Sequence, residues 1–381
     1  MQNSIRVVSE QISNFLRERV DAGDFPSAVY LVAEKGKIIL QDAVGYAVVE
    51  PERIEAKVDT IYDLASLTKV LVTGLLAAKL IDRDDIQLKG RVAIYLNEFD
   101  TKGKRMITIR DLLAHTSHLP AWKPLYLCVA EPAEIIQEIG QTPLNYEQHA
   151  VTYSDLNFIA LGTLIERVTG KSLDEAASEM IFEQLGLKIT FFDPASSYRP
   201  RIAASEKGNG FEKQTSIEQG YLQPLAPAGG SDLFRTHQIW GEVHDGNAYF
   251  MNGVGGHAGL FSTAEETFKI AQLFLPNYTT LLKPETCKFF RTNYTEGMNE
   301  DRSLAFQLAS TPESTAGVGM SPESFGHLGF TGTSLWIDPV KERVFILLTN
   351  RTHNRPLPFA NINAVRRRFH DIAAEALDKN A

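Results

Sequence analysis

Two pairs of β-rich segments lie at opposite ends of this 381-residue chain. In the first pair, residues 28–47 form two runs rich in valine, isoleucine and tyrosine, separated by a polar turn at residues 34–37. In the second pair, residues 331–338 and 343–350 flank a turn that contains Pro339. Short turns of this kind between β-rich runs are typical of hairpins. The sequence therefore predicts an antiparallel sheet built from both ends of the chain.

Helical periodicity marks both termini. Residues 1–21 and 359–377 each place apolar side chains on one face. The predicted faces are Ile5, Val8, Ile12, Phe15 and Leu16 in the first helix, and Ile362, Val365, Phe369, Ile372 and Ala376 in the last. We interpret the run Arg366-Arg367-Arg368 as a solvated edge of the last helix. The continuous apolar run 344–348 predicts a buried central strand.

The middle of the chain is predicted to be mainly helical. Residues 67–80, 108–115, 155–170 and 172–186 space their apolar side chains as helices do, and several of these segments end in glycine. We therefore predict an α/β (α+β) fold, in which an antiparallel sheet is flanked by N- and C-terminal helices and receives a mainly helical insertion. The predicted subdomains of this single unit are an α/β part, at about 1–65 and 220–381, and a helical part, at about 66–219.

Composition excludes some classes of function. The net charge of −9 argues against a nucleic-acid partner. Two cysteines exclude a disulfide framework, although a single bridge between Cys128 and Cys287 stays open. Charges interrupt every apolar stretch of residues 1–21, so we expect neither a signal-peptide core nor a membrane span. The chain as given reads as cytoplasmic, or as periplasmic or extracellular if a leader has been removed.

The most informative short motif is Ser66-Leu67-Thr68-Lys69, which follows a β-type stretch and opens a helix. One helical turn puts the Ser66 hydroxyl and the Lys69 amine on the same side. A serine becomes a nucleophile when a base takes its proton, and a lysine can serve if burial or nearby charge lowers its pKa. The alternative is a capping serine followed by a surface lysine. The apolar flanks of the motif favour a buried lysine. Burying a charged side chain is unfavourable unless it has a partner or a function, so this favours the catalytic interpretation.

Three other patterns are interpreted as structural. His115 and His118 have a metal-ligand spacing, but no third ligand follows at helical spacing. The dipeptide His244-Asp245 is typical of metal-dependent phosphohydrolases, but a single His-Asp pair is weak evidence for that function. The glycine-rich segment 253–259 lacks the residues of a phosphate loop and predicts a tight loop near the cleft, with His257 as a minor functional candidate.

Several segments resemble the serine β-lactamase and penicillin-binding protein superfamily, specifically its class C branch, which includes D-alanyl-D-alanine carboxypeptidases and β-lactamase-like carboxylesterases. The resembling segments are residues 62–70, 112–120, 151–170, 255–266 and 326–339, in the family's order. In this resemblance Ser66 and Lys69 form the first motif. Tyr153 and Asp155 match the second motif, Tyr-x-Asn, in which the tyrosine shares protons with the Ser66–Lys69 pair. Asp155 departs from asparagine and offers no amide N–H to a substrate.

The third motif of the family, Lys-Thr-Gly, is matched by His327-Leu328-Gly329. The resemblance implies that the backbone N–H groups of Ser66 and Phe330 form the oxyanion hole. His327 could replace the lost lysine charge only when protonated. Gly329 and Gly332 are expected to let a substrate lie close to this strand.

The resemblance implies a serine hydrolase that acts through an acyl-enzyme on an ester, amide or β-lactam carbonyl, without a cofactor or metal. The departures at Asp155, His327 and Leu328 favour an esterase or D-amino-acid peptidase over a dedicated β-lactamase. The alternative is a non-hydrolytic penicillin-binding or ligand-sensing protein of the same fold. The expected partner is a small molecule or peptide, and the oligomeric state stays open.

Overall fold

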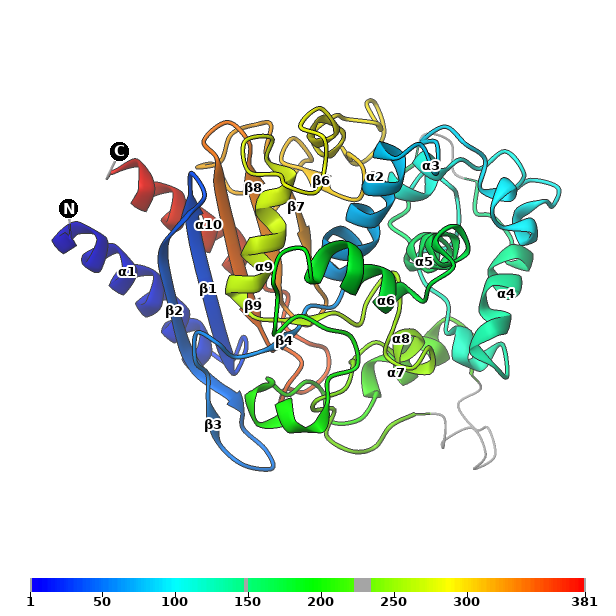
Figure 1. Ribbon diagram of the computed structural model, residues 1–381. Coiled ribbons are helices and arrows are strands. Elements are labelled where there is room, and N and C mark those ends of the chain that lie inside the picture. Colours follow the sequence, from blue (N-terminus) through cyan, green and yellow to red (C-terminus); the bar gives the residue numbers. More distant parts are fainter. Residues whose placement is uncertain (1, 147–149, 223–233, 380–381) are drawn as a thin grey trace.

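The computed structural model describes residues 2–146, 150–222 and 234–379, with side chains from residue 10 onward. A seven-stranded antiparallel sheet, in the order β3-β2-β1-β9-β8-β7-β6, joins the two ends of the chain (Figure 1). Its strands are β1 (Ser27–Glu34), β2 (Lys37–Val48), β3 (Ile54–Glu55), β6 (Gln307–Leu308), β7 (Phe325–Leu328), β8 (Ser334–Asp338) and β9 (Arg343–Thr349). A second sheet pairs β4 (Tyr62–Asp63) with β5 (Phe261–Ser262).

Both predicted hairpins are confirmed. β1 pairs with β2 from Ser27 opposite Gly45 to Glu34 opposite Lys37, and β8 pairs with β9. β9 is buried along its whole length and lies between β1 and β8, as the run 344–348 indicated. The antiparallel pairing of β1 with β9 is the contact that closes the two chain ends into one sheet.

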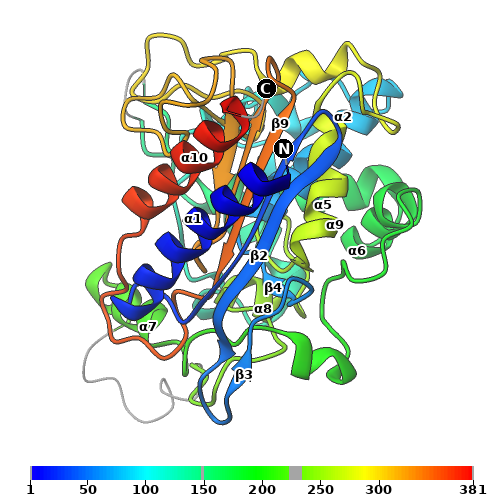
Figure 2. The same ribbon diagram turned by 90° about the vertical axis from the view of Figure 1, so that its left-hand side faces the viewer.

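Helices α1 (Gln2–Asp21) and α10 (Asn363–Asp378) cover one face of the sheet (Figure 2). Among the predicted face residues, Ile12, Leu16 and all five positions of the last helix are buried in one cluster, with Phe15 packed against it. The side chains of Ile5 and Val8 lie outside the described residues.

The prediction of a solvated arginine run is wrong at Arg366. This side chain is buried, and its Nη2 donates to the carbonyl oxygens of Gly329 and Thr333 at 2.8 and 3.0 Å. Helical periodicity alone puts Arg366 beside the buried Val365 and Phe369. Three consecutive residues of a helix span about 200° at 100° per residue, so one of the three arginines can face the core.

The opposite face of the sheet is covered by α9 (Ala264–Ala271), and the remaining helices extend beyond it (Figure 1). They are α2 (Leu75–Asp82), α3 (Ile109–Leu113), α4 (Ile135–Gln141), α5 (Asp155–Thr169), α6 (Leu173–Ala177), α7 (Gly210–Glu218) and α8 (Gly246–Phe250). The predicted fold class is confirmed. The proposed subdomain boundaries stay a prediction.

Two predicted boundaries shift. The strand expected from residue 331 begins at Ser334, because Thr331 and Thr333 use their hydroxyls to bind the main chain at residues 63 and 64. The last helix begins at Asn363, four residues after the predicted start, where the side-chain oxygen of Asn361 accepts the N–H of Asn363 at 3.0 Å. Both cysteines are free, Cys128 exposed and Cys287 buried. Within the described ranges, no helix is both long and apolar enough to cross a membrane.

Candidate active site

Ser66 follows a strained turn at the end of β4. Ala65 has a φ of 48°, a left-handed conformation that costs a non-glycine residue about 1–2 kcal/mol. The carboxylate of Asp63 holds this turn, because its two oxygens accept the N–H groups of Ala65 and His244, each at 2.8 Å. The carbonyl oxygen of Asp63 accepts the hydroxyl of Thr331 at 2.8 Å. The turn therefore presents Ser66 from a fixed backbone.

The side chain of Lys69 is fully buried, and its ammonium group reaches three oxygens. Nζ lies 2.9 Å from Ser66 Oγ, 3.0 Å from the carbonyl oxygen of His257 and 2.7 Å from Asp155 Oδ1. Burial by itself lowers the pKa of Lys69, but Asp155 and Tyr153 outweigh it by charge and hydrogen bonding, so the pKa is raised above its usual value. Lys69 is therefore an ammonium ion at neutral pH, not the neutral base that a lowered pKa would give.

The helix that begins at Lys69 is tied to the glycine-rich loop predicted at residues 253–259. Its first turns, Lys69–Gly74, are π-helical and fully buried. Thr73 donates its hydroxyl to the carbonyl oxygen of Gly256 at 2.6 Å. A Cβ on Gly256 would lie 2.1 Å from the Phe158 carbonyl oxygen, so only glycine allows this approach. The loop thereby brings the His257 carbonyl oxygen to Lys69.

Tyr153 and Asp155 come from the start of α5, where Ser154 is the N-cap residue. His115 accepts the N–H of Ser154 through its Nδ1 at 2.9 Å and packs its ring 4.7 Å from that of Tyr153. Burial, followed by the charges of Arg302 and Lys69, lowers the pKa of His115 well below its usual value. His115 is therefore a neutral acceptor that positions Tyr153. The sequence showed the turn at this histidine but not its contact with Tyr153.

Arg302 is a cation of the cavity that the motifs did not reveal. Its side chain is buried, and Nη2 donates to Glu300 at 2.9 Å. Nε and Nη1 have no partner among the residues that the structure describes. Its guanidinium lies 5.1 Å from the centre of the Tyr153 ring. An arginine in an irregular segment has no periodicity or motif that would signal such a position.

His327 packs its ring 5.7 Å from that of Tyr153 and is buried. Burial, followed by the charges of Arg302 and Lys69, holds the pKa of His327 well below its usual value. The imidazole is therefore neutral at pH 7, and Arg302 is a fixed cation beside Tyr153.

The two glycines near β7 are required by packing inside the protein. A Cβ on Gly329 would lie 1.9 Å from Thr333 Oγ1. Gly332 has a φ of 112°, and its Cβ would lie 1.9 Å from Thr349 Oγ1. Gly329 lines the cavity, whereas Gly332 is not among the lining residues. The expectation that Gly332 lets a substrate lie close to this strand stays a prediction, and the structure shows Thr349 of β9 on the side where a Cβ would lie.

Two backbone N–H groups, those of Ser66 and Phe330, have no acceptor within the described part of the chain. The peptide that carries the Phe330 N–H is held in place, since its carbonyl oxygen, that of Gly329, accepts Nη2 of Arg366 at 2.8 Å. Both residues line the same cavity. Two unpaired N–H donors on the wall of one cavity are the arrangement that an oxyanion requires.

The cavity has a volume of about 530 Å³, within the range of small-molecule sites. The predicted site residues that line it are Ser66, Tyr153, Asp155, His327, Gly329 and Phe330. Lys69 lies behind them, against Ser66. The lining residues that the motifs did not indicate include Trp122, Phe211, Glu212, Asp245, Arg302, Arg351 and Arg366. Among described residues, no group of three His, Cys, Asp or Glu side chains could hold a metal ion.

Glu212 and Asp245 are two neighbouring carboxyl groups on this wall. Glu212 accepts the N–H of Gly246 at 2.7 Å and the hydroxyl of Tyr126 at 2.8 Å. Burial, followed by the charge of Asp245, raises the pKa of Glu212 to about 7. Burial also acts to raise the pKa of Asp245, but its contact with His257 at 2.8 Å outweighs burial and lowers it. Glu212 therefore changes charge near neutral pH.

We expect Glu212→Gln to gain stability relative to the wild type as the pH rises from 5 to 8. An ordinary glutamate deprotonates near pH 4.5, whereas folded Glu212 deprotonates near pH 7, so the wild type loses stability through this group between those values. The gain reaches about 3 kcal/mol at most above pH 7. Chemical denaturation at pH 5 and pH 8 measures it. Glu218→Gln, an exposed change on the same helix, is the control. A difference that is constant with pH would contradict the expectation.

The sequence model of the Beta-lactamase family matches residues 12–367. The chain therefore belongs to the beta-lactamase family, and its sheet and helices form that family's serine hydrolase fold. One relative is a protein of Escherichia coli K12 named "Putative D-alanyl-D-alanine carboxypeptidase", which is 32% identical over 371 residues, covering 90% of this chain and 82% of the relative.

Solved structures show the same fold. EstCE1, described as a hydrolase with promiscuous acyltransferase activity, matches with a TM-score of 0.73 at 18% identity over 98% of this chain and 99% of its own. A class C beta lactamase from Rhodobacter sphaeroides matches with a TM-score of 0.71 at 18% identity over 96% and 99% of the two chains.

Proposed function

We propose that this chain is a serine hydrolase in which Ser66 attacks an ester, amide or lactam carbonyl and forms an acyl-enzyme. The observation that carries the proposal is the 2.9 Å contact between Ser66 Oγ and the buried ammonium of Lys69, on the wall of a cavity with two unpaired N–H donors. A fully buried lysine is rarely retained without a partner or a task.

The raised pKa of Lys69 decides how protons move in this proposal. Because the ammonium cannot accept a proton from Ser66, the acceptor is Tyr153 reacting as a phenolate beside it. The Oγ–carbonyl carbon bond forms, the oxyanion is held by the N–H groups of Ser66 and Phe330, and Tyr153 returns the proton to the leaving group as the old bond breaks. Water then repeats these steps and releases Ser66.

Three features favour an esterase or a D-amino-acid peptidase over a dedicated β-lactamase. Asp155 offers no amide donor, Leu328 has no hydroxyl, and neutral His327 lacks the charge of the family's lysine. Arg302 still supplies a cation with two unpartnered N–H groups near Tyr153, which suits a substrate with a carboxylate on its leaving group. The relative named for D-alanyl-D-alanine carboxypeptidase activity fits this preference.

We expect a fluorophosphonate probe to label Ser66 of the wild type stoichiometrically and to leave Ser66→Ala unlabelled, as measured by peptide mass spectrometry. Turnover of p-nitrophenyl esters, D-Ala-D-Ala peptides and nitrocefin is then compared. Labelling without turnover of any substrate would support the non-hydrolytic alternative. An absence of labelling in the folded wild type would end both acylation proposals, and fast nitrocefin turnover would reverse the substrate preference.

A further inference from the structure

We propose that the part of the cavity formed by Phe211 and Phe330 is an acyl subsite that selects an aromatic group of similar size to a benzyl group. The inference rests on the proposed acyl-enzyme function and names the acyl half of its substrate. The first observation is the gathering of aromatic rings. The ring of Phe211 lies 4.7 Å from that of Phe330 and 6.0 Å from that of Phe359.

Tyr153 and Phe211 contact different residues at the end of β7. His327 packs on Tyr153, and Phe330 packs on Phe211, three residues further along the same segment. His327 belongs to β7, whereas Phe330 lies in the turn that follows it, so two different parts of this segment make the two contacts. Ser66 lines the same cavity. A substrate whose carbonyl meets Ser66 can therefore extend towards both groups of residues.

The proton path decides which half of the substrate meets the aromatic rings. Tyr153 returns the proton to the leaving group, so the leaving group must lie within hydrogen-bond reach of Tyr153. The guanidinium of Arg302 lies on the same side, 5.1 Å from the Tyr153 ring. The acyl half is then left to point towards Phe211 and Phe330.

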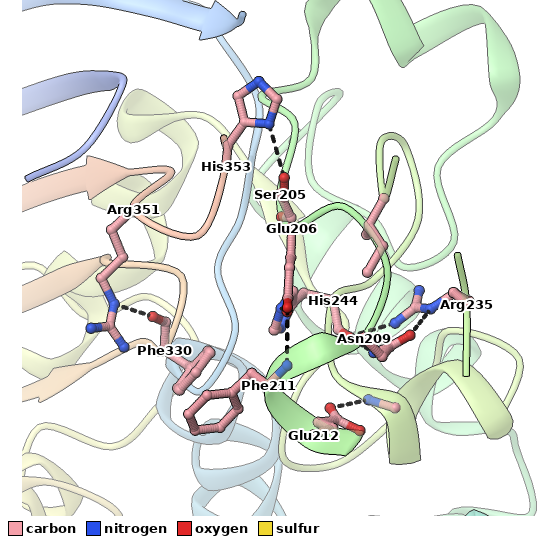
Figure 3. Close-up of polar contacts among 12 residues, drawn as sticks. Ser205, Glu206, Asn209, Phe211, Glu212, Arg235, His244, Phe330, Arg351 and His353 are labelled. Carbon is pink, nitrogen blue, oxygen red and sulfur yellow. Dashed lines mark hydrogen bonds and ion pairs between the residues drawn. The ribbon is translucent and has the colours of Figure 1, made fainter. Parts of the chain in front are cut away.

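The aromatic wall is held in place before a ligand arrives. In Figure 3 the rings of Phe211 and Phe330 lie together, and Arg351 binds the carbonyl oxygen of Phe330 at 2.7 Å. The ring of His244 stacks on Phe330 at 5.4 Å. Glu206 accepts the N–H of Phe211 at 3.0 Å.

Two further contacts anchor the start of α7. Arg235 donates to Asn209 at 2.7 Å, and Glu212 accepts the N–H of Gly246 at 2.7 Å. A wall fixed in this way loses little conformational freedom when it binds a ring. Phe211 and Phe330 are nevertheless only half-buried and line the cavity, so apolar ring surface is left for a ligand to cover.

The test compares p-nitrophenyl phenylacetate with p-nitrophenyl acetate, which share a leaving group and differ only in the acyl group. We expect kcat/KM of the wild type to be at least about tenfold higher for the phenylacetate, and Phe211→Ala to lower this ratio about tenfold. Phe211→Tyr should keep the preference. Phe191→Ala, in an aromatic pair outside the cavity lining, is the control that should keep the ratio. Equal use of both esters by the wild type, or an unchanged ratio in Phe211→Ala, would overturn the subsite.

A binding measurement separates this inference from the proposed function. In Ser66→Ala, the phenylacetate ester should bind about tenfold tighter than the acetate ester. Phe211→Leu keeps an apolar side chain but removes the aromatic ring, so it should remove most of this difference. If the wild type neither labels nor hydrolyses but this binding difference is found, the subsite stands and the acyl-enzyme fails. If esters are hydrolysed without the binding difference, the acyl-enzyme stands and the subsite fails.

Discussion

Replacement of Lys69 by methionine should lower kcat/KM for p-nitrophenyl acetate by about 10³-fold. Methionine fills a similar volume but removes the ammonium that holds Ser66 Oγ at 2.9 Å and that lies 5.0 Å from the centre of the Tyr153 ring. Without this charge, Ser66 loses its orienting contact and Tyr153 loses the cation beside its ring. Steady-state kinetics and the rate of fluorophosphonate labelling should both fall.

The same change should cost stability, because it leaves the Asp155 carboxylate without its ion-pair partner in a largely buried site. Removing one member of a buried pair costs about 3–5 kcal/mol. The double variant Lys69→Met/Asp155→Asn removes both charges, so it should recover most of the stability while its activity stays low. A folded Lys69→Met protein within tenfold of wild-type activity would contradict the role proposed for Lys69.

The part of the candidate site that the sequence revealed is the part set by short-range geometry. Ser66 and Lys69 are one helical turn apart, and the structure brings their side chains into contact. Tyr153 and Asp155 could be paired with them only through the family's motif order, since their sequence separation from Ser66 is long. The direction in which the pKa of Lys69 shifts could not be inferred from the sequence. Burial lowers this pKa and the charge of Asp155 raises it, and only the structure shows which effect is larger.

The missed residues reach the cavity through tertiary contacts alone. Phe211 sits on a short helix whose own sequence has no strong apolar face, and its position is set by contacts with residues 206, 235 and 246. Arg302 lies in an irregular segment, and Arg366 was hidden within a run of charges. The fold was more predictable, because β1 with β2 and β8 with β9 form hairpins whose pairing is local. Among these four strands, only the pairing of β1 with β9 is long-range.

Replacement of Arg302 by methionine should lower kcat/KM for a peptide ending in D-Ala-D-Ala by about 10²-fold, and by much less for the neutral p-nitrophenyl acetate. The carboxylate of the peptide is part of its leaving group, which must lie near Tyr153 to receive a proton. Nε and Nη1 of Arg302 are buried without partners in the described structure, so a carboxylate can accept from both. Arg302→Lys keeps the charge but loses the two-pronged geometry, and should recover only part of the loss.

The ratio of the two substrates is the informative quantity, because Arg302 also lies 5.1 Å from the Tyr153 ring centre. If its charge acted only on Tyr153, both substrates would lose activity equally, and the carboxylate role would be wrong. Glu300→Gln frees Nη2 from its charged partner but keeps the guanidinium, so it should preserve the ratio better than Arg302→Met. Arg291→Met, which removes an exposed arginine nearby in sequence, should leave the ratio unchanged. If Arg302 binds the substrate carboxylate, removing its guanidinium should reduce activity on the peptide and much less on the ester. The neutral ester has no carboxylate for Arg302 to bind.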